Sequence, residues 1–208
     1  AADLDDGFDI DEAGDGDIIA RLLHVTANNN LDEGIDFDEE GAGSTRLTFR
    51  HVEASGNTDE GIKATEDDVG ESDPGSIYAL FHRVTANDNG DDGIELEELD
   101  AGNVRATLRW VTASGNGDEG VQIAESGDGY LRTDIFKGQV DGNDGDGVQL
   151  EETGVGNLWA RLFLSQLNDN DGFGISAVEE DEGAGTLIEF LNQFSGNADG
   201  PKEVESTD

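Results

Sequence analysis

The chain has 208 residues and a formal net charge of -39, with 50 acidic residues against 11 Lys and Arg. This charge excludes nucleic acid as an expected partner, and an anionic membrane surface would also repel the chain. The absence of Cys excludes disulfides and thiolate metal sites. No apolar run approaches the roughly 18 residues of a membrane span, so we expect no membrane insertion.

A glycine that precedes a branched or aromatic residue recurs at nearly constant intervals. The intervals are 27 residues, apart from one of 32. The glycines in question are Gly7, Gly34, Gly61, Gly93, Gly120, Gly147 and Gly174. The longer interval contains the segment 67–76, where we expect a loop insertion. A fixed period of this length is typical of a solenoid, in which each repeat forms one turn.

Three short runs of alternating apolar residues follow one another within a repeat. Examples of the three runs are Val121/Ile123, Val104/Ala106/Leu108 and Val111/Ala113. Such alternation, bounded by Gly, Asn and Asp, predicts three short strands per turn and no helix. We therefore predict an all-β fold, a right-handed parallel β-helix solenoid of about seven 27-residue coils with three short parallel sheets. The solenoid is expected to cover residues 1–200, followed by a C-terminal tail at 201–208.

The motifs NGDEGVQI and NDNGDDGIEL resemble those of the pectate-lyase-like superfamily of parallel β-helix repeat proteins. The resemblance extends over residues 1–200 and implies the same right-handed fold. Polysaccharide lyases and hydrolases of this fold use calcium with a basic residue, or clustered Asp carboxylates, in a groove walled by long loops. The turns here are short and uniform outside 67–76. The sequence therefore leaves enzymatic activity open but favours a chain without a catalytic site.

Stacked turns place equivalent residues of successive repeats in columns. Relative to the repeated glycine, Glu stands five residues after in all seven repeats, Asn four before and Asp or Glu one before in six, and Asp two before in the first five. Like charges about 4.8 Å apart repel by roughly 1 kcal/mol in water. No Lys or Arg is expected at neighbouring turn positions, so the counter-charge should come from solution.

The spacing of the oxygen-bearing residues indicates which ion supplies this charge. Ser55, Asn57, Asp59 and Glu66 occupy positions 1, 3, 5 and 12 of one turn, and other turns repeat the pattern. This is similar to the spacing of an EF-hand loop, although the glycine falls at position 7 and strands flank the loop. Hard oxygen ligands without His or Cys favour calcium. We predict that multiple calcium ions are bound by Asn30, Asp32, Glu39, Asn57, Asp59, Glu66, Asn89, Asp91, Glu98, Asn116, Asp118, Glu125 and Glu152.

Other interpretations of the same residues stay open. The Asn residues suit a structural amide ladder, the Glu residues could cap backbone N–H groups, and the acids before the glycine could be solvated turn residues. Salt adaptation would also explain the excess of acid over lysine, since Lys63, Lys137 and Lys202 are the only lysines. It would scatter acids over the surface, however, without repeating Glu at one position.

Cations and aromatic residues gather in the second run of the repeats. The alternation turns Arg and Trp outward where Leu, Phe and Ala point inward. Arg and aromatic side chains are typical of binding surfaces, and they suit sugars that carry carboxylates or sulfates. The predicted ligand-binding residues are Arg46, Arg50, Arg105, Arg109, Trp110, Arg132, Trp159 and Arg161. Surface ion pairs, or packing against another domain or a second copy, are the alternatives.

Together these patterns predict a calcium-binding, calcium-stabilised extracellular β-helix repeat segment, secreted or at the cell surface. Its expected role is structural, adhesive or carbohydrate-binding, with calcium ions as partners, and an acidic polysaccharide or other domains of a larger protein as further partners. The alternatives are a polysaccharide lyase or glycoside hydrolase acting on acidic polysaccharide, and a halophile surface protein whose acidity is salt adaptation without specific calcium sites.

Overall fold

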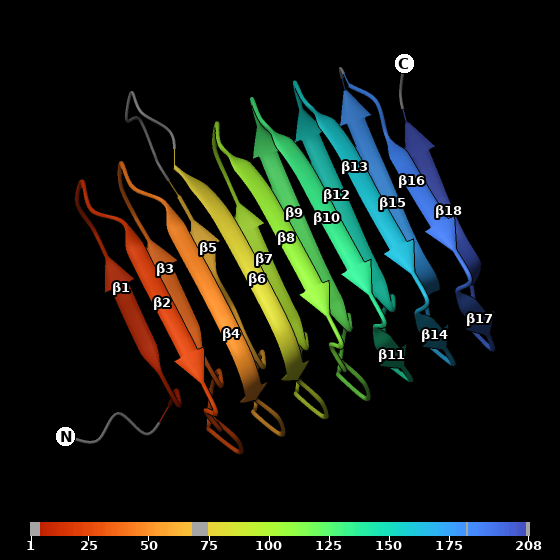
Figure 1. Cartoon of the computed structure of the whole chain (residues 1–208), viewed down its shortest axis with the longest axis horizontal. Coiled ribbons are helices and arrows are strands. Elements are labelled where there is room, and N and C mark those ends of the chain that lie inside the picture. Colours follow the sequence, from red (N-terminus) through yellow and green to blue (C-terminus); the bar gives the residue numbers. More distant parts are fainter. Residues whose placement is uncertain (1–4, 68–74, 182, 207–208) are drawn as a thin grey trace.

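A computed structural model of the chain describes residues 5–67, 75–181 and 183–206. These residues form eighteen strands and no helix, which confirms the predicted all-β class. Most of the expected loop insertion at 67–76 lies outside the described residues. The strands lie side by side along one axis, with the first and last strands at opposite ends (Figure 1).

The strands build three parallel sheets. The first sheet has the order β1 (Asp9–Glu12), β3 (Asp36–Glu39), β5 (Thr65–Glu66), β7 (Ile94–Glu98), β9 (Val121–Gly127), β12 (Val148–Gly154), β15 (Phe173–Asp181) and β18 (Gly200–Ser206). The second has the order β16 (Thr186–Phe190), β13 (Asn157–Phe163), β10 (Tyr130–Phe136), β8 (Asn103–Arg109), β6 (Ser76–Thr85), β4 (Thr45–Glu53) and β2 (Ile18–Leu23). The third contains β11 (Gln139–Asp141), β14 (Gln166–Asn168) and β17 (Gln193–Ser195).

The pairing register follows the sequence period. Val121 of β9 pairs with Val148 of β12, which pairs with Ile175 of β15, so each step along the sheet is one 27-residue repeat. The fold is therefore a parallel β-solenoid of about seven turns, as the repeated glycines predicted. Residues 200–206, most of which were expected to be part of a tail, form β18 and pair with β15.

The third predicted strand forms a sheet only in the later turns. In the earlier turns, β4 and β6 continue from the second run into the third, and isolated bridges such as Thr85–Thr112 extend the ladder. The chain turns at this corner through one non-glycine residue per repeat with a φ between 54° and 56°. These left-handed residues are His24, His51, Arg83, Trp110, Lys137, Leu164 and Leu191.

A narrow apolar core runs along the inside of the solenoid. Phe49 and Phe81 are fully buried, and their rings stack with centroids 4.6 Å apart. The inward direction expected for Leu47, Phe49, Ala106, Leu108 and Ala160 is confirmed, since each is 2% exposed or less. Burial of such side chains stabilises the fold by about 1.5–3 kcal/mol each for the larger ones. In the described part of the chain, no helix has the length and apolar character needed to cross a membrane.

Candidate metal site

The Asn column forms a ladder of side-chain amides inside the solenoid. Asn89 Nδ2 donates to Asn116 Oδ1 at 3.1 Å, and Asn116 Nδ2 donates to Asn143 Oδ1 at 2.9 Å. The backbone N–H of Asn89 also donates to Asn116 Oδ1, at 3.1 Å. The ladder extends from Asn30 to Asn197. Because each inner amide oxygen accepts two hydrogen bonds, the predicted ligands Asn30, Asn57, Asn89 and Asn116 are part of a structural ladder.

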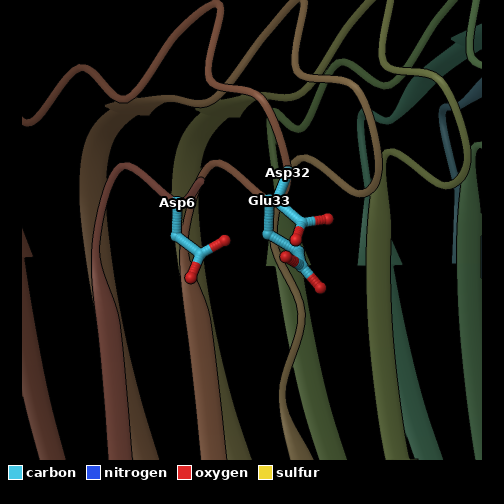
Figure 2. A group of neighbouring side chains, drawn as sticks. All are labelled: Asp6, Asp32 and Glu33. Atoms are coloured by element: carbon cyan, nitrogen blue, oxygen red, sulfur yellow. The ribbon is translucent and has the colours of Figure 1, made fainter. Parts of the chain in front are cut away.

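The predicted Asp ligands lie at the turns, beside the acids that directly precede the repeated glycine. Three groups of carboxylates each have oxygens within 4.8 Å of one another, and we call them the first, second and third turn clusters. They contain, in order, Asp6, Asp32 and Glu33; Glu33, Asp59 and Glu60; and Asp91, Asp92 and Asp118. Figure 2 shows the first cluster, in which Asp32 and Glu33 come from one turn and Asp6 from the preceding one.

The second turn cluster contains a cation from the protein itself. Lys63 Nζ lies 3.4 Å from Glu33 Oε1 and 3.6 Å from Glu60 Oε1. The expectation that no Lys or Arg would occupy a neighbouring turn position was therefore wrong at this turn. Lys63 stands two residues after the repeated glycine, where side chains point away from the core and toward the cluster. Although Lys63 is partly buried, these carboxylates raise its pKa.

The third turn cluster has no such amine, because none of its carboxylates forms an ion pair with a described Lys or Arg. Asp92 is 3% exposed, and its Oδ1 accepts the backbone N–H of Glu119 at 2.7 Å. Burial, reinforced by Glu119, raises the pKa of Asp92 to about 9. Burial also raises the pKa of Asp91, with a contribution from Asp118. The cluster therefore carries negative charge at a cost that a bound cation would reduce.

The predicted Glu ligands lie away from the turn clusters, on the inner face of the first sheet. The predicted ligands Glu39, Glu66, Glu98, Glu125 and Glu152, followed by Glu179, pair in register from strand to strand and are 1% exposed or less. None of the three turn clusters includes any of them. The residues at positions 3, 5 and 12 therefore do not form one site. The Asn residues belong to the amide ladder, the Asp residues to the turn clusters, and the Glu residues to the inner face of the first sheet.

The capping interpretation of the glutamates is correct at two turns. Glu12 Oε2 accepts the backbone N–H of Gly14 at 2.9 Å, and Glu98 Oε1 accepts that of Asp100 at 3.3 Å. Burial and the neighbouring glutamates raise the pKa of Glu125 to about 9. The pKa of Glu152 is raised to about 6, also mainly by burial. A single capping bond therefore does not account for the whole column.

The acids directly before the glycine were missing from the predicted ligand set. Glu33, Glu60 and Asp92 are 8%, 6% and 3% exposed, so they are not the solvated turn residues that one interpretation expected. Their sequence signal was the same as that of the predicted Asp residues, an acid at a fixed distance from the glycine in successive repeats. The EF-hand spacing has no ligand at this position, so it did not predict them.

The predicted ligand-binding residues share the outer face of the second sheet and its corner, which we call the basic face. One column contains Arg46, Tyr78, Arg105, Arg132 and Trp159 in register. The guanidinium groups of Arg132 and Arg161 lie 4.3 and 4.5 Å from the Trp159 ring centroid. This arrangement places stacked rings and guanidinium groups along several turns.

Two arginines of the basic face form ion pairs. Arg46 Nη1 lies 2.7 Å from Asp17 Oδ2, and Arg161 Nη2 donates to Asp134 Oδ2 at 2.7 Å. By contrast, Arg50, Arg105 and Arg109 form no ion pair with any residue that the structure describes. A cavity of about 350 Å³ opens on this face and is lined by Thr107, Arg109, Trp110, Asp134, Ile135, Phe136, Arg161 and Phe163.

Comparisons with protein-family models, with curated protein sequences and with solved structures find no match for this chain.

Proposed function

We propose that the chain is a calcium-binding, calcium-stabilised β-solenoid segment with a structural role. The observation that carries this proposal is the third turn cluster. There, Asp91, Asp92 and Asp118 bring carboxylate oxygens of two successive turns within 4.8 Å of one another, with Asp92 buried. An ion held between two turns would bind the stacked state and not the unfolded chain, and would therefore stabilise the fold by mass action.

Calcium fits the donor set better than other metals. The cluster offers only hard carboxylate oxygens, and Ca²⁺ takes six to eight oxygen ligands in flexible geometry, with water completing its coordination. The first and second turn clusters share Glu33, and Lys63 already neutralises part of both. Sites of modest affinity are typical of extracellular modules, which meet calcium at high concentration. The proposal therefore includes a secreted or cell-surface location.

The decisive experiment follows folding by circular dichroism and thermal melting, first in EDTA and then in millimolar calcium. We expect calcium to raise the melting temperature by several degrees. The variant Asp91→Asn/Asp118→Asn should lose part of this shift and bind one ion fewer. The matched control Asp11→Asn/Asp128→Asn removes the same charge from exposed positions outside the clusters and should keep the full shift.

Two outcomes would contradict the calcium proposal. A melting temperature that does not change with calcium would eliminate it outright. Equal stabilisation by magnesium or by high NaCl would support salt adaptation without specific sites, because screening of a net charge of -39 needs no particular ion.

The basic face favours a second function, the binding of an acidic polysaccharide. Nine of the eleven Lys and Arg residues lie in or beside the second sheet, although the chain as a whole is strongly acidic. Arg105 forms no ion pair with a described residue, and Trp159 presents an aromatic surface beside two guanidinium groups. Stacked rings and guanidinium groups suit sugars that carry carboxylates or sulfates. Membership of the pectate-lyase-like superfamily belongs to this proposal and is supported by the repeat motifs and the parallel solenoid.

A glycan array with uronate and sulfated polymers tests this second function. We expect Arg105→Ala/Trp159→Ala to lose binding, while Arg21→Ala, at the N-terminal end of the same face, retains it. If binding survives the double substitution, the basic face is not the site. Release of unsaturated, ultraviolet-absorbing products from a uronate polymer would instead indicate a polysaccharide lyase.

A further inference from the structure

The inner wall of the first sheet contains an uninterrupted run of buried carboxyl groups. Glu98, Glu125, Glu152 and Glu179 pair in register on four successive strands, and we call these four residues the glutamate column. Each is 1% exposed or less. Four stacked charges in a protein interior require a partner, because an isolated buried carboxylate costs far more than the fold can absorb.

The protein supplies few hydrogen-bond donors to this column. Glu98 Oε1 accepts a backbone N–H, and Glu179 Oε2 accepts the Ser206 hydroxyl at 2.9 Å. Both oxygens of Glu125 and both of Glu152 are buried, and no described donor reaches any of them. The charged groups that act on Glu125 are the carboxyls of Glu98 and Glu152, which repel it. No described Lys or Arg forms an ion pair with the column.

A wall of glycines faces the column and contributes further acceptors. A Cβ atom added to Gly129 would overlap both the carbonyl oxygen of Gly102 and Glu125 Oε1. At the next turn, a Cβ on Gly156 would overlap the carbonyl oxygen of Gly129 and Glu152 Oε1. Carbonyl and carboxylate oxygens of two turns therefore lie close together beside each of these glycines. At Glu125 and Glu152, where no described donor reaches the carboxyl oxygens, this crowding of oxygen acceptors favours a hard cation.

We propose that the glutamate column is a second cation site, separate from the turn clusters, which binds calcium between the stacked carboxyls of successive turns. Strands of one sheet lie about 4.8 Å apart, so an ion midway between two rungs would be about 2.4 Å from the oxygens above and below, within the range of calcium–oxygen distances. This inference rests on the proposed function only in the choice of calcium.

Charge balance sets the expected number of ions. One calcium ion neutralises two carboxylates, and ions in adjacent gaps would repel one another at about 4.8 Å. The four glutamates therefore accommodate two ions, one between Glu98 and Glu125 and one between Glu152 and Glu179.

The experiment measures bound calcium by equilibrium dialysis and the melting temperature in EDTA and in calcium. The variant Glu125→Gln/Glu152→Gln keeps the side-chain shape and removes one charge from each pair. We expect it to bind two fewer ions than the wild type, to melt at a higher temperature than the wild type in EDTA, and to show a smaller calcium-induced shift. The control Glu97→Gln/Glu151→Gln changes neighbouring, outward-facing positions of the same strands and should behave as the wild type does.

The two proposals fail separately. If Asp91→Asn/Asp118→Asn loses an ion while Glu125→Gln/Glu152→Gln loses none, the turn cluster binds calcium and the column proposal is overturned. The column proposal is also overturned if the column variant melts higher in EDTA but keeps the full calcium shift, because the column then holds protons. If the column variant does not fold, the single variant Glu152→Gln replaces it and should lose one ion. Loss of ions from the column variant alone would eliminate the turn cluster instead.

Discussion

The solenoid contains two buried polar columns that differ in one chemical property. The Asn ladder and the glutamate column each place one side chain per turn inside the fold, in register over successive strands. An amide carries both a donor and an acceptor, so Asn116 donates to one neighbour and accepts from the other. A carboxylate only accepts, so Glu125 and Glu152 cannot satisfy one another without a proton or a cation.

Repetition amplifies this difference. Each added turn gives the Asn ladder another pair of satisfied hydrogen bonds, whereas each added Glu extends a row of like charges. Because the backbone carbonyls beside the column are also repeated, no donor from the described residues reaches the carboxyl oxygens of Glu125 or Glu152. A repeat protein with such a column depends on its solution conditions, while a chain with amide ladders alone would not.

The largest expected effect is a loss of stability with rising pH in the absence of calcium. Burial raises the pKa of Glu125 to about 9, so between about pH 4.5 and 9 the folded chain holds a proton that the unfolded chain has released. Stability is therefore greatest in acid and falls as pH rises through this window, by on the order of 5 kcal/mol. Urea denaturation in EDTA at a series of pH values measures this.

The substitution Glu125→Gln isolates the contribution of the column to this pH dependence. Asp92, whose pKa is also raised to about 9, and the general repulsion of the acidic surface remain in the variant. We expect a shallower fall in stability for Glu125→Gln than for the wild type. Parallel curves for the two proteins would show that the column does not titrate in this range.

The second largest effect is expected when a carboxylate is introduced into the Asn ladder. Asn116→Asp places a carboxylate in the amide ladder, where it can no longer donate to Asn143. The buried charge and the lost hydrogen bond should lower the free energy of unfolding by about 4 kcal/mol at neutral pH. Denaturant titration measures the loss, with Gln149→Glu on the outer face as the control for an added charge. Equal effects of the two substitutions would contradict the ladder as a distinct environment.

The third largest effect concerns the glycines that lie against the glutamate column. Gly129→Ala places a Cβ against the backbone carbonyl of Gly102 and the Glu125 carboxyl, and should cost about 3 kcal/mol by overpacking. Gly142 has a φ of 71° but has no atom within 4 Å of the position of an added Cβ, so Gly142→Ala should cost only about 1 kcal/mol. Thermal melting of the two variants under one condition compares them. A smaller loss for Gly129→Ala would show that the wall has room to move.

The fold could be predicted because a constant period fixes both the stacking and the register. The repeated glycines gave the turn, and the alternation after them gave the inward residues of the first sheet. The corner between the second and third runs could not be predicted. Its left-handed residues include His51, Trp110, Lys137 and Leu164, which share no side-chain property, so the backbone path and not the residue type defines the corner.

The separation of the predicted glutamate ligands from the turn residues could partly be predicted from the sequence. Val121, Ile123 and Glu125 lie at alternate positions of one strand, so the alternation that buries the first two also buries the third. The spacing of a calcium loop instead grouped the glutamates with the turn residues. The position of Lys63 beside two turn acids could not be read from the linear sequence, since Glu33 is contributed by the neighbouring turn.

The smallest effect concerns the basic face, where side chains contact one another in water and not in the interior. Trp159→Leu removes the contacts with Arg132 and Arg161 but keeps an apolar side chain, and exposed cation–π contacts contribute only about 0.5–1 kcal/mol each. We expect a loss of about 1 kcal/mol in urea denaturation, well below that of Asn116→Asp. If the face binds an acidic polysaccharide, the same substitution should weaken that binding at least about tenfold, equivalent to about 1.4 kcal/mol. A variant with reduced stability and unchanged binding would assign Trp159 to the fold, whereas weakened binding with nearly full stability would assign it to recognition.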